Sequence, residues 1–465
     1  MSEGLTYNEP RPETPLRPAY AFNLPGASVA LYEGPIAGLA DGQRPGRIEL
    51  NCGPRVGLRW RAELQPDDHR VDLGQIPLTV HRAGRDWTIE AHERRSGEGW
   101  INQAIFERPN ASLQRVLVQW MNLPEIIGPV GLVESTGGSK RWWLGRWRAD
   151  VDGWRLMLDV RPEYTEAMDQ AHETHLYLFT HVMQIRRADD SEFDVDAVSR
   201  LLECLRVTFS FAFGRWVAPV LPVGYDRIGG VAYEAWTSPI CDPAKSVGSP
   251  WLYRGRPEDL TELVRCSVPA FRDTTGPGNT RFQMSLAVQA VEAGFVEQRI
   301  LAAAPALEHL AWAELVLGKR WTRNEYDERY AEDRLRYLLQ LAHIPTDINP
   351  IALPALWKFA QPNRLDGPTA ATRVRNRLIH PQTPQDQIYR HDGLVEDAWR
   401  LTRRYVTLLL LHSIGYRGAY IDPVHTTGWE GTTAPVPWDT ATPIPTPTTP
   451  PTKKYRPRPN RRLAT

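Results

Sequence analysis

The stretch FQMSLAVQAVEAGFVEQRILAAAPALEHLAWAELVL, residues 282–317, divides this 465-residue chain into two structural classes. Its apolar residues recur at the spacing of three and four that is typical of an amphipathic helix. The pattern predicts one long helix with a kink near Pro305, because proline lacks the amide proton and its ring clashes with the preceding turn. The sequence before this stretch has a different period, so the chain changes character here.

Residues 28–186 contain short segments in which apolar and polar residues alternate between clusters of Gly, Pro, Asp and Asn. Such alternation is typical of antiparallel strands. The clearest segments are GRIELNC (46–52), RVGLRWRAEL (55–64), DWTIEAHE (86–93), QRVLVQWM (114–121), GWRLMLDV (153–160) and THLYLFTHVMQI (174–185). With a helix near 194–211, two further strands and a short helix at 257–266, they predict a β-rich domain over residues 28–277. We expect a sandwich or barrel with tryptophans in its core, preceded by an extended segment over residues 1–27.

Helical patterns continue after residue 317. Thr322 and Glu325 fit a capping box at the start of one helix. Gly367 and Pro368 suit the first turn of another, since proline is tolerated there. The expected elements are a helix over 322–343, a short element around 356, a helix over 367–380 and a last helix over 392–414. They predict an all-α bundle of four or five helices over residues 278–422, and an α+β chain overall.

Residues 423–465 are rich in Thr and Pro and end in a cluster of Lys and Arg. This composition cannot bury a core, so we expect a disordered basic tail.

Composition limits the possible partners. Lys plus Arg and Asp plus Glu both number 55, so any basic site must be local. We find no apolar segment of the signal-peptide kind and no run near the ~20 apolar residues of a membrane span. The four cysteines are scattered without a metal-ligand spacing, which suggests free thiols. We therefore expect a cytoplasmic protein that does not contact membranes.

The stretch RVRNRLIHP, residues 373–381, is the candidate site. A helical projection at about 100° per residue places Ala371, Val374 and Leu378 on a buried face. Asn376, His380, Arg373 and Arg377 fall together on the opposite face. Pro381 disfavours a helical conformation at His380, so the helix should end there.

This set of side chains suits RNA cleavage. Histidine exchanges protons near neutral pH, so it can move the proton of a 2′-hydroxyl or of a leaving oxygen. Arginine and asparagine can stabilise the charge that develops on the phosphate. Such a reaction requires no metal and no other cofactor.

The run from Arg375-Asn376 to His380 resembles the Arg-Asn-x-x-x-His motif of the HEPN superfamily (higher eukaryotes and prokaryotes nucleotide-binding domains). A β-rich region followed by such a helical domain is similar to the ApeA-like anti-phage proteins. The resemblance implies a metal-independent endoribonuclease that acts as a homodimer, with two motifs forming one cleft. Arg375 and His380 would be catalytic, Asn376 would hold and orient, and Arg373 and Arg377 would bind RNA.

In projection Arg375 lies about 140° from His380, nearer the buried face. Three explanations are open: the arginine side chain curls around, the helix distorts before Pro381, or Arg373 takes part of the role.

We therefore expect a defence ribonuclease of the abortive-infection kind, with a β-rich sensing or regulatory domain that answers to a phage-derived trigger or inhibitor protein. Fold and motif alone cannot report such a trigger, so the defence role comes from the resemblance. Two alternatives are a non-catalytic dimerisation module that binds nucleotide, RNA or protein, and the toxin half of a toxin–antitoxin pair.

Other signals favour structural roles. HETHLYLFTH holds His172, His175 and His181, but His175 and His181 are six residues apart on one strand, roughly 20 Å, which is too far to bind one ion without another strand. We therefore expect strand histidines with satisfied hydrogen bonds and no metal site. KRWWLGRWR (140–148) interleaves basic and aromatic residues, but we expect a β-hairpin with its tryptophans turned inward. Glu308 and Glu314 could approach the basic face and balance its charge, but we expect them to be solvated, as surface glutamates on helices usually are.

Overall fold

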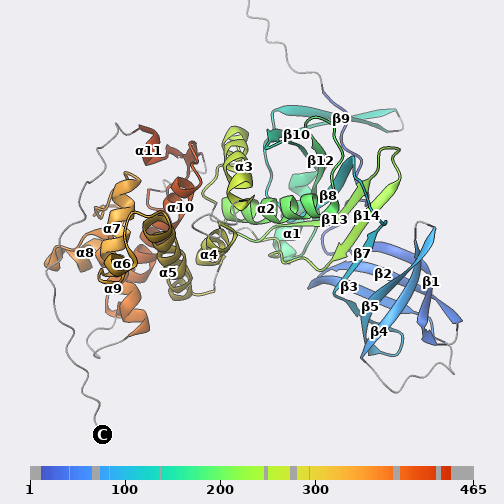
Figure 1. Ribbon diagram of the computed structural model, residues 1–465, viewed down its shortest axis with the longest axis horizontal. Coiled ribbons are helices and arrows are strands. Elements are labelled where there is room, and N and C mark those ends of the chain that lie inside the picture. The colour runs from blue at the N-terminus through green and yellow to red at the C-terminus, as the bar shows by residue number, and fades with distance from the viewer. Residues whose placement is uncertain are drawn as a thin grey trace, which may run out of the picture.

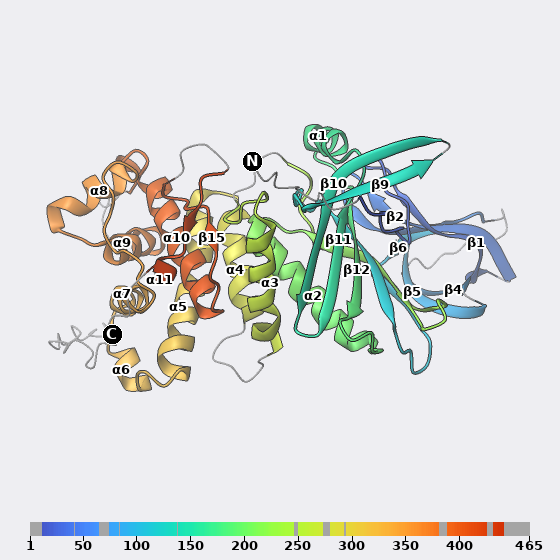
Figure 2. The same ribbon diagram turned by 90° about the horizontal axis from the view of Figure 1, so that it is seen from above.

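The computed structural model describes residues 12–40, 42–64, 74–82, 84–136, 138–245, 250–272, 280–292, 294–380, 388–425 and 431–440. A β-rich amino-terminal region precedes a helical region, as the sequence predicts (Figure 1). The barrel lies at one end of the elongated molecule and helices α7 to α9 lie at the other (Figures 1 and 2).

The first strands close into a six-stranded antiparallel barrel in the order β1-β2-β3-β6-β5-β4. Alternation of apolar and polar residues creates its inside, where Ile48, Leu58 and Trp60 are buried, and its polar outside. The strands are β1 (Val29–Ala40), β2 (Gly42–Cys52), β3 (Val56–Ala62), β4 (Gln75–Arg82), β5 (Arg85–Arg95) and β6 (Glu98–Ile101).

An eight-stranded antiparallel sheet follows, in the order β7-β14-β13-β8-β12-β11-β10-β9. Helix α2 packs on it, with Phe209 beside Trp120 and Trp147 at ring-centroid distances of 4.8 and 6.3 Å. The elements are β7 (Gln103–Glu107), β8 (Arg115–Met121), β9 (Val130–Thr136), β10 (Ser139–Val151), β11 (Trp154–Val160), α1 (Tyr164–Thr174), β12 (Phe179–Arg187), α2 (Val195–Phe213), β13 (Ala218–Tyr225) and β14 (Val231–Thr237).

The strand expected at residues 174–185 was wrong at its start. Strand β12 begins only at Phe179, because Thr174 is the last residue of helix α1, His175 caps that helix, and residues 176–178 form a connection without regular structure. The strand that we predicted from the alternating pattern therefore begins five residues too early.

The described part of the amino-terminal segment, residues 12–27, has little regular secondary structure, with a bend at 19–20 and a turn at 25–26, and it contacts the eight-stranded sheet. The backbone of Glu13 forms an isolated parallel β-bridge with Leu132 of β9, and the amide of Leu16 donates a hydrogen bond to the Asp159 carboxylate at 2.7 Å. This segment therefore packs against strands β9 to β11, although its described residues form no long strand of their own.

The helical region contains α3 (Pro257–Arg272), α4 (Thr280–Glu292), α5 (Val296–Trp312), a π-helical turn (Ala313–Leu317), α6 (Arg323–Asp327), α7 (Ala331–Leu341), α8 (Pro354–Ala360), a 3-10 turn (Gln361–Asn363), α9 (Gly367–Ile379), a 3-10 turn (Ile388–Arg390) and α10 (Leu394–Ser413). Helix α5 packs against both α4 and α10. One apolar core continues from the sheet through α2, α3 and α4 to α10.

The single helix expected over residues 282–317 was wrong. Two helices meet around Gly294, where Phe295 has an extended conformation and its amide donates to the Gln298 side chain at 3.1 Å. Pro305 lies within α5 on its exposed side, and no helix end falls there. The helix expected over 322–343 is likewise two helices, α6 and α7. The capping box of Thr322 and Glu325 is confirmed.

The stretch Val296–Leu317 is long and apolar enough to cross a membrane by length and composition. The prediction of no run near the length of a membrane span was therefore wrong for this stretch, which packs against α4 and α10 and has 39% of its most apolar window buried.

The prediction that a disordered tail begins at residue 423 was also wrong. Strand β16 (Ala434–Pro435) pairs with β15 (Ala419–Tyr420), and α11 (Pro437–Thr440) follows. Val436 is fully buried, and the Trp438 indole donates to the Tyr416 carbonyl at 2.8 Å. These two apolar side chains anchor a Pro- and Thr-rich segment. The tail expected over residues 441–465 lies outside the described residues.

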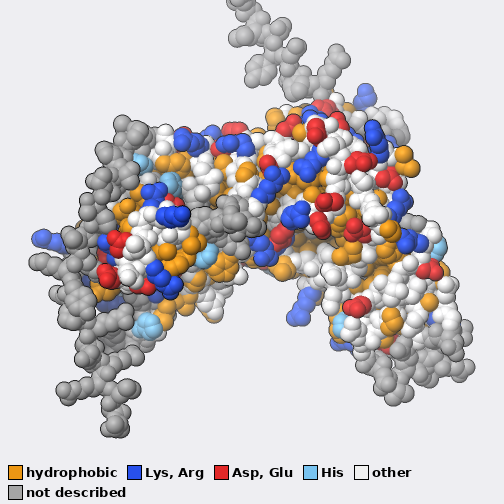
Figure 3. All heavy atoms as spheres, viewed as in Figure 1, with side chains coloured by type: hydrophobic (Ala, Val, Ile, Leu, Met, Phe, Trp, Pro, Cys, Tyr) orange, Lys and Arg blue, Asp and Glu red, His pale blue; other side chains and the backbone are white. Residues whose placement is uncertain are grey.

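The surface of the molecule mixes charges of both signs. On the face drawn in Figure 3, the described Lys and Arg side chains are interspersed with Asp and Glu over the sheet. This distribution agrees with the equal totals of basic and acidic residues. A site for an anionic ligand therefore depends on a local arrangement of side chains.

Candidate active site

Helix α9 begins at a well-fixed amino terminus. Asp366 accepts a hydrogen bond from the Thr369 amide at 3.1 Å, and Pro368 lies in the first turn. Arg336 of α7 donates two hydrogen bonds to the same carboxylate, at 2.5 and 3.1 Å. Although burial raises the pKa of Asp366, the hydrogen bonds from Arg336 and Thr369 hold it below its ordinary value. The start of α9 is thus tied to α7 by charge as well as by packing.

The buried face of α9 is the one expected. Ala371 and Val374 are buried and Leu378 is half-buried against the core. This face anchors the helix in the bundle and leaves its other side available for ligands.

The end of α9 keeps helical geometry up to its last residue. The helix is regular as far as Ile379, and the His380 amide closes it by donating to the Asn376 carbonyl at 2.7 Å. Pro381, which the sequence assigns as the stop, lies outside the described residues.

Three of the five predicted site residues form one exposed row. Arg373, Asn376 and His380 are spaced three and four residues apart, so they follow one another along a single face of α9. All three side chains are exposed, and no carboxylate in the described ranges pairs with Arg373. This row presents a cation, an amide and an imidazole to solvent together.

The other two predicted residues are turned towards neighbouring helices. A guanidinium nitrogen of Arg375 lies 3.8 Å from a carboxylate oxygen of Glu308 on α5. The Arg377 guanidinium lies over the Phe359 ring of α8, 5.0 Å from its centroid. Because α9 stays regular, Arg375 does not join the row of His380 within one chain. Of the three explanations above, a role for Arg373 fits this geometry best.

The side chain of Glu308 is 39% exposed, so it is partly solvated, but it also approaches Arg375 of α9. It accepts hydrogen bonds from Arg334 at 2.9 Å and from the Tyr326 hydroxyl at 3.2 Å, besides its longer contact with Arg375. The Arg334 guanidinium in turn lies 4.0 Å from the centroid of the Tyr326 ring. Helical spacing in α5 could not reveal this cluster, because its partners come from α6, α7 and α9.

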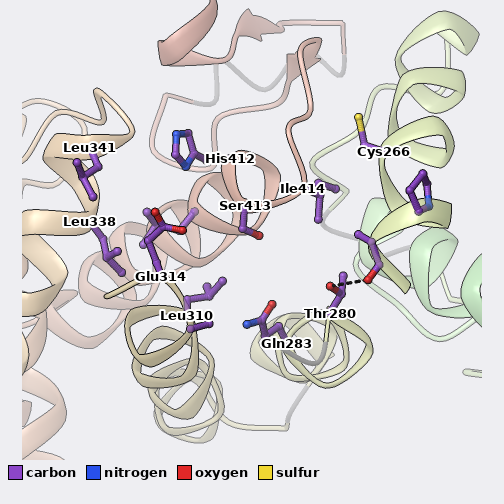
Figure 4. Close-up of a pocket in the computed structure, with 14 residues that line it drawn as sticks. Cys266, Thr280, Gln283, Leu310, Glu314, Leu338, Leu341, His412, Ser413 and Ile414 are labelled. Carbon is purple, nitrogen blue, oxygen red and sulfur yellow. Dashed lines mark hydrogen bonds between the residues drawn. The ribbon is translucent and has the colours of Figure 1, made fainter. Parts of the chain in front are cut away.

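A pocket between several helices lies elsewhere. It encloses about 390 Å³ between α3, α4, α5, α7 and α10. Figure 4 shows Leu338 and Leu341 on one side of it and Cys266 on the opposite side, with His412 and Gln283 coming from other helices. Burial lowers the pKa of His412, and it raises the pKa of the Cys266 thiol to about 12, so this thiol is not activated as a nucleophile.

The histidines considered for a metal site are not on one strand. His172 lies in α1 and His175 caps that helix, whereas His181 lies in β12. His181 is 1% exposed, and neither ring nitrogen has a hydrogen-bond partner among the described residues. Burial lowers its pKa to about 3, so this imidazole is neutral. Within the described part of the chain, no three His, Cys, Asp or Glu residues are grouped to hold a metal ion.

The hairpin at KRWWLGRWR is confirmed, since β9 and β10 pair from Thr136 and Ser139 onward. Trp147 is buried and Trp143 is half-buried, as expected. Trp142, however, is 58% exposed, so the inward orientation was wrong for this residue. All four cysteines are free thiols.

Comparisons with known proteins point to one group. A family model described as the YopA central domain matches residues 108–247, which hold most of the eight-stranded sheet with α1 and α2. A second, described as the YopA C-terminal domain, matches residues 284–434, from α4 to β16. No solved structure matches the chain. The "SPbeta prophage-derived uncharacterized protein YopA" of Bacillus subtilis (strain 168) is 27% identical over 306 residues, which cover 64% of this chain and 66% of that protein. The chain is thus similar to YopA in its central and carboxy-terminal parts, and all six strands of the barrel lie outside the two family models.

Proposed function

We propose that the helical domain is a metal-independent endoribonuclease of the HEPN type that acts in anti-phage defence. The observation that carries the proposal is the exposed row of Arg373, Asn376 and His380 at the end of α9. A row of this kind stabilises no core and pairs with no described carboxylate, so its chemistry is available to a phosphate ligand.

The reaction is transesterification at phosphorus. The 2′-oxygen of a ribose attacks the adjacent phosphorus, the bond from phosphorus to the 5′-oxygen breaks, and the products are a 2′,3′-cyclic phosphate and a 5′-hydroxyl. One base takes the proton of the 2′-hydroxyl, and one acid gives a proton to the 5′-oxygen. Arg373 and Asn376 would donate hydrogen bonds to the phosphate oxygens while negative charge develops on them.

A second copy of the chain supplies what one chain lacks. Each chain brings one His380, and two copies would provide both a base and an acid. Exposed apolar side chains near α9 support such a contact: Ile351 is 90% exposed, Trp357 on α8 is 40% exposed and Ile379 is 43% exposed. A second subunit would remove this apolar surface from water. Arg375, held by Glu308 in one chain, is the residue that the HEPN motif would assign to the joint cleft.

In this proposal the β-rich region senses a phage-derived trigger or inhibitor protein, or it regulates the nuclease in another way. The protein would act in the cytoplasm. A relative whose name marks it as prophage-derived makes phage infection the first condition to test. The second candidate is a non-catalytic binding module, which the pairing of Arg375 with Glu308 favours because that arginine already has a structural partner.

The test is RNA cleavage by the full chain in the presence of a chelator. We expect total RNA to be cut to fragments with 2′,3′-cyclic ends, and His380→Ala to reduce the rate by roughly 100- to 10,000-fold. His391→Ala, a change in another histidine of the same region, is the matched control and should cut like the parent chain. If the parent protein binds RNA without cutting it, or if His380→Ala cuts at the parental rate, the nuclease proposal is wrong. Co-purification of a neighbouring protein that blocks cleavage would support the toxin alternative.

A further inference from the structure

The outer face of the barrel carries a cationic surface that the proposed nuclease does not use. It consists of Arg47 and Glu49 of β2, Arg59 and Arg61 of β3, Arg94 of β5, and Glu98 and Trp100 of β6, around a hollow of about 370 Å³. We call it the barrel face. The barrel lies at the opposite end of the molecule from α8 and α9 (Figures 1 and 2).

Strand register brings these side chains together in two rows. Across β2, β3, β6 and β5, Glu49 is opposite Arg59, Arg59 is opposite Trp100, and Trp100 is opposite His92. In the next row Arg47 is opposite Arg61, and Arg61 is opposite Glu98. Directly opposite residues in an antiparallel pair are in contact range, so each row is continuous.

Charge on the barrel face is only partly neutralised. Arg47 lies 3.3 Å from Glu33 and 3.1 Å from Glu49, and Glu98 lies 3.7 Å from Arg95. Arg59, Arg61 and Arg94 are exposed, and none of them has an ion-pair partner among the residues that the structure describes. Two like charges opposite each other, as at Arg47 and Arg61, destabilise a sheet, so folding alone does not favour this pattern.

A bulge adds the third unpaired arginine. The register of β5 against β6 shifts between Glu93 and Arg95, which leaves Arg94 without a cross-strand partner. Bulges turn a side chain away from the direction that regular alternation would give it. Here Glu93 is buried, 3% exposed, and accepts a hydrogen bond from the Gly97 amide at 2.9 Å, while Arg94 is exposed.

An aromatic platform lies beside the arginines. The rings of His92 and Trp100 are stacked, with centroids 5.0 Å apart and planes at 11° to each other. Trp100 is 43% exposed although it is a large aromatic residue. The neighbouring Trp60 is buried instead and donates to the His92 carbonyl at 3.2 Å, which fixes the backbone beneath the stack.

We propose that the barrel face binds single-stranded nucleic acid, with a base stacked on Trp100 and the backbone phosphates on Arg59, Arg61 and Arg94. Unpaired bases stack on aromatic side chains, and arginines bind phosphates through several hydrogen bonds. A duplex is a poorer occupant, because its bases are already stacked. An acidic peptide would use the arginines but leave the Trp100 ring without a partner. The inference does not rest on the nuclease proposal, since binding here requires no cleavage.

The test measures binding of fluorescent oligouridylate and oligothymidylate to the full chain carrying His380→Ala, by fluorescence anisotropy at several salt concentrations. We expect both single strands to bind, with a slope of log K against log salt of about −2, the value for about three phosphate contacts. Trp100→Leu should weaken binding roughly 5- to 150-fold, and Trp100→Phe should retain most of it. Arg59→Gln and Arg61→Gln should each reduce the magnitude of the slope by about 0.7.

Trp142→Ala is the matched control, because Trp142 is exposed and follows Arg141 on a different sheet. It should bind like the parent, and equal melting temperatures should show that every variant is folded. The proposal is wrong if a folded Trp100→Leu binds as tightly as the parent, or if polyglutamate or a duplex of the same length competes as well as the single strand. A difference between the two oligonucleotides identifies RNA or DNA as the ligand.

Discussion

Arg146 in the eight-stranded sheet is 3% exposed and donates two hydrogen bonds of 2.6 Å to Asp159, whereas Arg373 at the end of α9 is exposed to solvent. A histidine in each region shows the same difference in exposure. His181 is buried in β12 and His380 is exposed. Burial fixes the ionisation state and the partners of a side chain, which suits a structural role. The exposed residues keep the freedom to bind a ligand.

The largest expected effect concerns the buried ion pair. Asp159→Ala leaves the Arg146 guanidinium buried with only the more exposed Glu13 as a carboxylate partner. We expect the free energy of unfolding, measured with urea, to fall by about 3–5 kcal/mol. Asp150→Ala removes an exposed partner of Arg155 from β10 and should cost less than about 1 kcal/mol. Equal losses for the two variants would contradict the contrast between buried and exposed charges.

The next effect concerns the exposed row. If Arg373 donates to the phosphate, Arg373→Ala should reduce the rate of RNA cleavage by roughly 100- to 1,000-fold, or about 2.7–4 kcal/mol. Arg375→Ala should reduce it less than about tenfold, because Glu308 holds Arg375. Initial cleavage rates of the two folded variants decide between them. A larger loss for Arg375→Ala would mean that this arginine leaves Glu308 in the active dimer.

The buried imidazole predicts a dependence of stability on pH. The pKa of His181 is lowered to about 3 in the folded chain, so the unfolded chain binds more protons in acid. The contribution of the neutral His181 to the free energy of unfolding is therefore fully present above about pH 6.5, and it falls progressively as the pH drops towards 3. Between pH 7 and pH 5 the loss should be on the order of 2 kcal/mol. The measurement is urea unfolding at both pH values. His181→Leu should lose less stability over this interval than the parent, and an equal loss in both would refute the assignment.

The smallest effect concerns the half-exposed cluster around Glu308. Glu308→Gln keeps the size of the side chain and removes the charge that faces Arg334 and Arg375. Because Glu308 is 39% exposed and solvent screens the pairs, we expect a loss of about 1 kcal/mol or less in urea unfolding. A loss as large as that of Asp159→Ala would show that the cluster is as structural as the buried pair of the sheet.

Elements with a strong local signal were predicted well. The expected helix over residues 367–380 is α9, Gly367–Ile379, and its buried face is the predicted one. Asp366 and the proline in the first turn fix its start by local hydrogen bonds and backbone geometry, which the sequence displays directly. The alternation of GRIELNC and RVGLRWRAEL likewise identified β2 and β3.

Elements that depend on distant partners were predicted poorly. The predicted single helix with a kink near Pro305 is two helices that meet around Gly294, and Pro305 lies inside the second of them. Residues 434–435 pair with β15, an association that their Pro- and Thr-rich composition conceals. The five residues of the candidate site are those that the sequence proposed, but the sequence could not show that Arg375 meets Glu308 of α5 and that Arg377 meets Phe359 of α8.

Periodicity and short-range spacing were enough to establish the order of a β-rich and a helical region, the helix α9 and a polar face with Arg373, Asn376 and His380, although Arg377, predicted on the same face, lies over Phe359 instead. Those features depend on residues a few positions apart, whose relative placement local backbone geometry fixes. Three other features came from the folded chain alone: the first six strands close into a barrel, Arg59, Arg61 and Arg94 gather beside Trp100, and particular arginines are paired. They depend on register between strands and on contacts between remote segments, which hydrophobic alternation does not specify.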